Sequence, residues 1–522
     1  MSEVYTNPLP PFNGSIKSRF VSLDTDRSPQ LRRTELYAAW TLPSIMPEVN
    51  SRHDEVQGNL DSIGAQATNH LSNLIAETVF SPTRSFFRLE LTDKMQQQLA
   101  PAGQEGQVMA SKIDMELASV ERRSMKRLVR MGYRTAAVLA LKNLIISGNA
   151  LVFHPENEKA QVYSFRDWVC VRDVSGFPVE IITRDCKALE TFHPSIQNQL
   201  LQTGRYRNGL HQNVTIYTRA IYMNGKYYVR QAAEDVNLDT YAVYPARLCP
   251  WLVLTWNLLR GENYGRGLVE DYAGAFHAVT MLTAALTKGA AIAADIKFLV
   301  HPASGLDVEE LNKAESGSYH LGKEGDITTP QLNKALDFNL ANNLLERYSR
   351  EISRAFLMQQ GTTRDAERVT AVEIRRDALE LERSFGGIYS RFSEEWQNPL
   401  ARLLLDGLQI DIGTEQAIEP VIVTGLDSLS RNGELDNLQM FLQDLTQLDT
   451  VPEDARREIH LGRFIQKTAT LRGVQDWQSI MKTPDEKQAE QQHALAMQQA
   501  LINQQTQGQV QTAVAKETAK EQ

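Results

Sequence analysis

The chain has 522 residues, of which 42% are hydrophobic and 23% charged, so we expect a soluble protein with several domains or one multi-layered body. A net charge of −9 argues against tight, sequence-specific DNA binding, but it suits a channel along which DNA slides or an ordinary acidic cytosolic protein. The three cysteines, without a CxxC pair, argue against a disulfide framework and a zinc site.

The N-terminal part is predicted to be mainly helical. Residues 31–39 and 64–80 have helical character, and the second segment carries apolar side chains at helical spacing: Leu71, Leu74, Ile75 and Val79. Residues 85–91 alternate like a strand. Residues 105–131 form a charged helix with neighbours of opposite sign, which is typical of an outer surface. Residues 1–20 lack an apolar core, so no secretory signal is expected.

A helix over 133–147 precedes a region in which short strands dominate. Gly148-Asn149 is the turn between this helix and a strand at 150–153. Asn224-Gly225 separates two alternating segments and predicts a β-hairpin. Further strands are expected at 162–165, 179–182 and 214–217. Residues 1–260 are therefore predicted to form an α+β body.

A hydrophobic helix is predicted at 268–294, after the glycine-rich segment 261–267. One stripe of this helix carries Leu268, Tyr272, Phe276, Val279, Leu282 and Leu286. Small residues indicate close packing against neighbouring subunits, namely Ala284, Ala285, Gly289, Ala290, Ala291 and Ala293. The overlapping segment 272–300 is the one membrane-like candidate, but its charged residues would be costly in lipid. We therefore expect a buried helix among neighbouring helices, and no membrane.

A strand-and-turn insert at 296–330 separates this helix from a second one at 334–358. The second helix has apolar residues four apart: Leu336, Leu340, Leu344, Tyr348, Ile352 and Phe356. At about 1.5 Å per residue, each helix would be roughly 35–40 Å long.

A polar loop at 359–368 follows, and the next helix begins at Thr370 with a capping box, Thr370-Ala371-Val372-Glu373. Because helices hold both ends of this short loop, we expect its charged side chains to be aimed at a target. Helices are also predicted in 425–480. Residues 484–522 are rich in Gln and Ala, which indicates disorder or a weak coiled coil.

The sequence contains no credible catalytic centre. The segment 317–324 nearly matches the phosphate-loop pattern GxxxxGK[ST], but Glu324 stands where Ser or Thr must meet Mg²⁺. The ten histidines lack ligand spacing, and neither HExxH nor GxSxG occurs. Arg364 and Arg368 would neutralise the nearby acids Asp365 and Glu367. We expect no enzyme activity, no cofactor and no metal.

The remaining constellation is cationic and covers 334–376. It holds eight basic and six acidic residues, a local balance of +2 in an acidic chain. Glu346–Arg350 and Arg347–Glu351 are spaced i,i+4, and helix-stabilising pairs are the favoured interpretation of these four residues.

Ring assembly would change the weight of the loop arginines, because a cyclic oligomer repeats every side chain around its axis. Arg364 and Arg368 would then form positive belts that face passing DNA. Arg368 could instead brace the loop against a neighbouring acid, and both roles stay open.

Several of these segments, in this order, resemble the portal, or head-to-tail connector, proteins of short-tailed double-stranded-DNA phages (podoviruses). The strongest resemblance lies over 261–408, in Glu367-Arg368-Val369-Thr370-Ala371, Leu379-Glu380-Leu381-Glu382 and Phe385-Gly386-Gly387-Ile388-Tyr389-Ser390. Weaker matches are Gly148-Asn149, Thr183-Arg184-Asp185, Tyr264-Gly265-Arg266 and Thr424-Gly425-Leu426. The C-terminal tail matches no part of the pattern.

The resemblance implies an elongated α+β, mainly α subunit that assembles as a ring. In chain order it implies a wing at 1–260, a downward stem helix at 261–295, a clip at 296–332, an upward stem helix at 333–358, a tunnel loop at 359–370, a wing helix and return at 371–424, a crown at 425–483 and a tail at 484–522.

It also implies a function. Twelve copies would form the channel at one capsid vertex of the virion, assembled in the host cytoplasm, through which DNA is packaged and ejected. The implied partners are the chain itself, non-specifically bound duplex DNA, major capsid and scaffolding proteins, a separate large terminase that supplies the ATPase, a tail adaptor and internal core proteins.

The implied site residues fall into three groups. The tunnel loop would present Gln360, Thr362, Thr363, Arg364 and Arg368. The stem would present Lys334, Arg347, Arg350 and Arg354. The clip would dock terminase and adaptor through His301, Glu309, Lys313, His320 and Lys323.

Two other classes of protein remain. A DNA-packaging ATPase, or another DNA-processing subunit, would need an intact phosphate loop and an acidic metal site. A scaffold would be dominated by long polar helices, and a shell protein by β-rich sequence. The order helix, insert, helix, loop fits neither a scaffold nor a shell protein well.

Overall fold

The computed structural model describes residues 14–46, 61–80, 85–91, 103–155, 158–203, 211–294, 299–302, 304, 306–313, 319, 321, 323, 325–328, 335–358, 387–408 and 418–422. All of them belong to a unit that spans Met1–Gly425, and Leu426–Gln522 forms a second unit. The predicted tunnel loop, crown and tail therefore lie outside the described residues.

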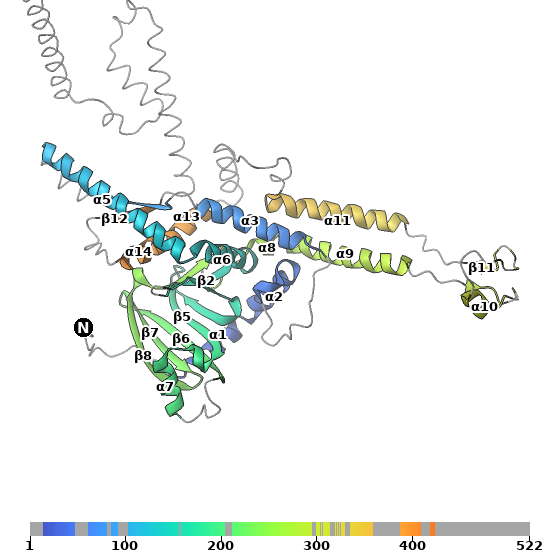
Figure 1. Ribbon diagram of the computed structural model, residues 1–522, viewed down its shortest axis with the longest axis horizontal. Coiled ribbons are helices and arrows are strands. Elements are labelled where there is room, and N and C mark those ends of the chain that lie inside the picture. Colours follow the sequence, from blue (N-terminus) through green and yellow to red (C-terminus); the bar gives the residue numbers. More distant parts are fainter. Residues whose placement is uncertain are drawn as a thin grey trace, which may run out of the picture. The chain divides into compact units, whose positions relative to one another are not determined.

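A five-stranded antiparallel sheet, in the order β4-β5-β6-β7-β8, forms the β-rich part of the first unit (Figure 1). Its strands are β4 (Trp168–Arg172), β5 (Pro178–Ala188), β6 (Asn213–Met223), β7 (Lys226–Ala233) and β8 (Val236–Pro245). The predicted hairpin is confirmed, since Asn224 and Gly225 join β6 to β7 with φ values of 52° and 79°. Two positive φ angles in succession are what a type I′ turn requires.

Small helices pack against this sheet. Helix α1 (Ile16–Asp26) buries Ile16 and Phe20 against Val169 and Ile182. Helix α7 (Pro194–Gln202) belongs to a separate apolar cluster with residues of β6, β7 and β8: Val214, Ile216, Ala233 and Leu238.

A three-stranded sheet, β3-β2-β9, and several helices form the main core. The strands are β2 (Asn149–Phe153), β3 (Gln161–Tyr163) and β9 (Trp251–Thr255), and the helices are α2 (Ser28–Trp40), α3 (Ile63–Val79), α5 (Gly103–Arg130) and α6 (Tyr133–Ser147). Strands β1 (Phe87–Leu91) and β12 (Ile418–Ile422) pair in antiparallel fashion, so distant parts of the chain meet here.

A π-helical segment, Ser393–Gln397, joins α13 (Ile388–Phe392) to α14 (Asn398–Asp406), and we call it the π-turn. Three consecutive side chains of the π-turn bond to the core. Glu395 accepts from the Thr255 backbone N–H at 3.0 Å, and Trp396 Nε1 donates to the Tyr133 hydroxyl at 2.5 Å. Gln397 Nε2 donates to the Val79 carbonyl at 3.0 Å. This one short segment thus bonds three elements: β9, α6 and α3.

Most predicted elements are present, with local corrections. The predicted strand 162–165 ends at Tyr163, because the Ser164 side chain accepts from the Arg166 N–H and starts a 3-10 turn. The predicted helix 268–294 is divided at Tyr272 into α8 (Leu268–Asp271) and α9 (Ala273–Ala294). The insert contains a short helix, α10 (Val308–Lys313), as well as strands and turns. The prediction of an α+β chain rich in helix is confirmed.

Candidate functional site

Residues 148–149 contact residues 256–267 where a long pair of helices begins, and we call this contact the root. Asn149 and Gly265 exchange two hydrogen bonds: Asn149 Nδ2 donates to the Gly265 carbonyl at 2.9 Å, and the Gly265 N–H donates to Asn149 Oδ1 at 2.7 Å. The Trp256 N–H donates to the Gly148 carbonyl at 3.0 Å. Two of the short segments that carry the resemblance, at 148–149 and 264–266, thus meet in space.

Glycine is required on both sides of the root. Gly148 has a φ of +76°, and a Cβ there would lie 2.3 Å from the Arg266 carbonyl carbon. A Cβ at Gly267 would lie 2.6 Å from the Ile145 carbonyl oxygen and 2.8 Å from the Gly148 nitrogen. These contacts are with backbone atoms, which cannot rotate away. Only backbone without side chains can pass this closely.

The five-stranded sheet is fastened to the same root. The Cys170 N–H donates to the Tyr264 hydroxyl at 3.0 Å, and the Arg172 N–H donates to Asn263 Oδ1 at 2.8 Å. The Arg172 guanidinium donates to three carbonyls, those of Asn263, Gly176 and Val253. Burial raises the pKa of the Tyr264 hydroxyl, which therefore stays protonated.

From the root, α9 and α11 (Ala335–Ala355) run side by side in opposite directions (Figure 1). Near the root, the rings of Phe276 and Phe356 are 5.6 Å apart. Towards the other end of α9, a Cβ at Gly289 would lie 2.5 Å from the Phe338 ring, so this aromatic side chain packs directly on the glycine. We call the two helices the stem pair.

Burial within the stem pair falls away from the root. Ile352 and Phe356 are fully buried, whereas Leu340 is 62% exposed, Met281 60% and Ile292 52%. Ala273–Ile292 is long and apolar enough to cross a membrane by length and composition alone, which for a single helix is weak evidence. Only 17% of its most apolar stretch is buried within the chain. The expectation of a buried helix is therefore wrong within a single chain. The exposed side chains of the stem pair are apolar here, which suits contact with another protein surface.

Three of the predicted stem cations share one helix face. Arg347, Arg350 and Arg354 are spaced i, i+3, i+7 on α11, and all three are exposed. Arg350 pairs with Glu346 at 3.0 Å, as predicted. The predicted Arg347–Glu351 pair does not form.

Sequence direction explains why one pair forms and the other does not. An acid four residues before a base is the favourable orientation on a helix, and Arg347–Glu351 has the reverse order. In the described part of the chain, Arg347 and Arg354 form no ion pair. Lys334 lies outside the described residues.

The chain leaves α11 through a strained residue. Leu357 has a φ of +56°, a conformation that costs a side-chain-bearing residue about 1–2 kcal/mol. Its side chain is buried, and its carbonyl lies 3.1 Å from His70 Nε2. Helix α11 thus ends just before the predicted tunnel loop, whose residues Gln360, Thr362, Thr363, Arg364 and Arg368 lie outside the described part.

The predicted docking residues lie on a small insert built on β10 (Leu299–Val300) and β11 (Ile327–Thr328). His301, Glu309, Lys313 and Lys323 are all exposed, and Glu309 pairs with Lys313 at 3.7 Å. His320 lies outside the described residues. The Lys323 N–H donates to Asp326 at 2.6 Å in a turn that leads into β11, whereas a phosphate loop leads into a helix.

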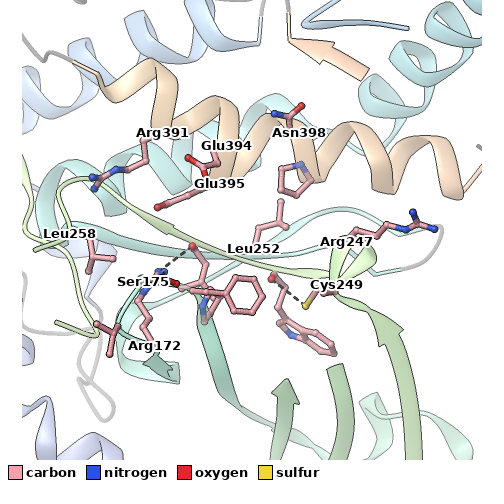
Figure 2. Close-up of a pocket in the computed structure, with 18 of the residues that line it drawn as sticks. Arg172, Ser175, Arg247, Cys249, Leu252, Leu258, Arg391, Glu394, Glu395 and Asn398 are labelled. Carbon is pink, nitrogen blue, oxygen red and sulfur yellow. Dashed lines mark hydrogen bonds between the residues drawn. The ribbon is translucent and has the colours of Figure 1, made fainter. Parts of the chain in front are cut away.

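A groove of about 1060 Å³ lies between α13–α14 and the strand region around β9 (Figure 2). Glu395 accepts from both the N–H and the hydroxyl of Thr255, and burial raises the pKa of its carboxyl although Arg172 and Arg391 oppose this. Burial also raises the pKa of the Cys249 thiol to about 12. A carboxyl committed to one partner and a protonated thiol offer structural bonding rather than acid–base catalysis.

Metal ligands are not gathered either. In the stretches of chain that the structure covers, no three His, Cys, Asp or Glu side chains cluster.

Sequence reasoning gave no structural role to the root or the π-turn. The matched segments Gly148-Asn149 and Tyr264-Gly265-Arg266 were a signal, but their pairing joins residues 116 apart. The π-turn has no spacing signature in one sequence.

Known proteins are similar to this chain over most of its length. A family model described as bacteriophage head to tail connecting protein matches residues 13–480. The portal protein of Enterobacteria phage SP6 is 37% identical over 486 residues, covering 91% of this chain and 92% of the relative. That of Escherichia phage T7 is 30% identical over 488 residues, covering 90% and 89%. The neck of an empty gene transfer agent particle aligns with a TM-score of 0.38 and 13% identity, covering 82% of this chain and 92% of that one.

Proposed function

The chain belongs to the family of bacteriophage head-to-tail connecting proteins, and on this premise we propose that its stem pair lines the DNA channel of a ring. The protein is a portal protein, a structural virion component at the junction of capsid and tail, through which the genome is packaged and ejected. The observation that carries the proposal for the stem is the exposed face of Arg347, Arg350 and Arg354 in a chain of net charge −9.

The ring is supported by the uncovered surface of the stem pair. Met281, Ile292 and Leu340 leave apolar area in water on a single chain, and a second copy would cover it. A contact between different faces of neighbouring copies closes into a ring when the rotation between them is right. We place the homododecamer implied by the resemblance on this contact.

The arginine face suits DNA that must slide. Arg347 and Arg354 are about 10 Å apart along the helix axis, and ring symmetry would repeat them around the channel. Phosphate contacts of this kind are non-specific and position the duplex without reading bases. The acidic remainder of the chain limits trapping of the polymer.

We assign the other segments as the sequence suggests. The tunnel loop at 359–370, which follows the strained Leu357, would add Arg364 and Arg368 to the channel. The clip at 296–332 would dock the large terminase and later the tail adaptor. Its fully exposed side chains Tyr319 and Leu321 support a docking role, because large apolar groups in water favour a partner. Scaffolding, capsid and core proteins would contact the remaining surfaces.

The stem assignment is tested by removing its charge. Rings carrying Arg347→Gln, Arg350→Gln and Arg354→Gln should assemble, as seen by electron microscopy, but package less DNA per head. A matched control removes three exposed charges elsewhere, with Arg32→Gln, Lys159→Gln and Lys187→Gln, and should package normally. Normal packaging by the stem variant would refute the assignment.

The loop assignment has its own test. Arg364→Ala and Arg368→Ala should lower genome retention in filled heads, whereas full retention in both variants would exclude a role in holding DNA. Exchange of 296–332 for an unrelated turn should abolish packaging while rings persist. An ATPase assay of the purified ring addresses the alternative of a packaging ATPase, which predicts turnover.

A further inference from the structure

A second cationic surface lies on α5 and the first turn of α6. We call it the α5 basic face, and it consists of Arg122, Arg123, Lys126, Arg130 and Arg134, all of which are exposed. The sequence suggested a helix of mixed charge over 105–131, but its C-terminal half is dominated by bases. From residue 116 to residue 134 there are six basic and two acidic residues.

The helix gathers these cations on one side. At about 100° per residue, the four cations of α5 fall within about 100° of its circumference and span about 12 Å of its axis. Gly132, with a φ of +60°, joins α5 to α6, and Arg134 follows in the first turn of α6.

The neighbouring charges do not neutralise this face. In the part of the chain that the structure covers, none of its five members forms an ion pair. Glu121 is turned towards β1, where its carboxylate accepts from the Leu89 N–H at 2.8 Å. Arg127 is turned towards the end of α14, where a Cβ at Gly407 would lie 2.0 Å from its guanidinium.

The arrangement is unfavourable for the isolated helix. Arg122–Lys126 and Lys126–Arg130 are like charges at i,i+4, each of which costs roughly 0.2–0.5 kcal/mol. Two exposed bases on other helices have an acid at this spacing instead, as in Glu346–Arg350 and Glu309–Lys313. A polyanion would relieve the repulsion.

We propose that the α5 basic face binds the phosphate backbone of duplex DNA outside the channel. Duplex DNA carries one charge per roughly 1.7 Å of its axis, so a 12 Å row of cations meets several phosphates. Long basic side chains without amides or acids make positioning contacts rather than base contacts. An acidic protein fits less well, because the nearby exposed apolar side chain is the small Val129, whereas protein interfaces favour aromatic anchors.

The test uses DNA that cannot thread a ring. Assembled rings are titrated with covalently closed circular duplex, which can reach only their outer surfaces, at several salt concentrations. Wild-type rings should bind, with log K falling linearly against log salt. The variant with Arg122→Gln, Arg123→Gln, Lys126→Gln and Arg130→Gln should bind at least about tenfold more weakly at low salt. Its salt slope should be shallower by up to about 3.6, since each lost phosphate contact removes about 0.9.

The stem variant described above is the matched control and should bind closed circles as wild type does. Failure of the channel assignment would thus leave this result untouched. Equal binding of circles by the α5 variant and wild type would overturn the proposal. So would poor incorporation of the α5 variant into heads with unchanged circle binding, which would indicate an acidic protein partner. Electron microscopy checks the rings, and Lys126→Gln with Arg130→Gln serves if the fourfold variant does not assemble; half of the slope change is then expected.

Discussion

The root and the outer part of the stem pair differ in how far a single chain completes their packing. At the root, Asn149 and Gly265 bond reciprocally and two glycines admit backbone where no Cβ fits. A few helical turns away, Leu340 and Ile292 lie in water. The root is specified within one chain, whereas the outer stem is left incomplete by it. The contrast teaches that one chain fixes where the stem begins, and in the proposed ring other copies would complete the burial of the rest.

The largest expected effect is at the root, with Gly267→Ala. The added Cβ would meet three backbone atoms at 2.6 to 2.8 Å, so either the α6–β2 turn or the start of α8 must move. We expect a loss of about 3 kcal/mol or more in the free energy of unfolding, or failure to fold. Chemical denaturation of the purified chain measures it. Gly274→Ala is the control, because nothing lies within 4 Å of its Cβ, and it should leave stability unchanged or slightly raised.

The outer stem should respond in the opposite way. Leu340→Glu with Ile292→Glu places charges where one chain exposes its side chains, so the unfolding free energy should change by no more than about 0.5 kcal/mol. Ring formation should be lost, because the charges would be buried between copies without partners. Size-exclusion chromatography with light scattering gives the mass. Intact rings would show that copies do not cover these positions.

The same contrast separates what could be read from the sequence. Local periodicity was enough for α3, α5, α6 and α11, and Asn224-Gly225 for the hairpin, because these depend on near neighbours. The β1–β12 pair, the root and the π-turn depend on contacts between distant segments, and one sequence carries no such information.

The sequence predicted which charged residues form the candidate site better than it predicted which of them form ion pairs. The arginine face of α11 follows from spacing alone, but spacing without direction wrongly paired Arg347 with Glu351. The α5 basic face was visible as a run of bases at 122–134. Its significance depends on where Glu121 and Arg127 point, which only the fold decides.

Acid should weaken the region next to the root before it affects the outer stem. His154 follows β2, stacks on Tyr133 at 5.3 Å, and has no hydrogen bond on either ring nitrogen. Burial lowers its pKa from 6.5 to about 3. Below pH 6.5 the unfolded chain takes up a proton that the folded chain refuses, so stability falls as the pH falls towards 3, by up to about 1.4 kcal/mol per pH unit.

His154→Phe keeps the stacking and removes the titration. The stability difference between variant and wild type should therefore grow from pH 6.5 to pH 4, as denaturation at each pH would measure. Parallel curves over that range would mean that other groups dominate acid unfolding. Hydrogen exchange compares the two regions. As the pH falls, the amides of α6 and β2 should lose protection first, while the protection of α11 stays as it is at neutral pH.

The smallest expected effect tests whether the unpaired Arg347 lowers the stability of the chain while it serves DNA packaging. Asn343→Glu would place an acid four residues before the unpaired Arg347, in the favourable orientation, and should stabilise the chain by about 0.2–0.5 kcal/mol. The same change neutralises part of the arginine face, so packaging should decline although the fold is firmer. Asn198→Glu, on the exposed face of α7, adds the same charge outside the stem and the clip and serves as the control. Because the gain in stability and the loss in packaging have opposite signs, their joint appearance cannot come from misfolding. A variant that is more stable and packages normally would mean that Arg347 is an ordinary solvated side chain, and the cationic face would then reduce to Arg350 and Arg354.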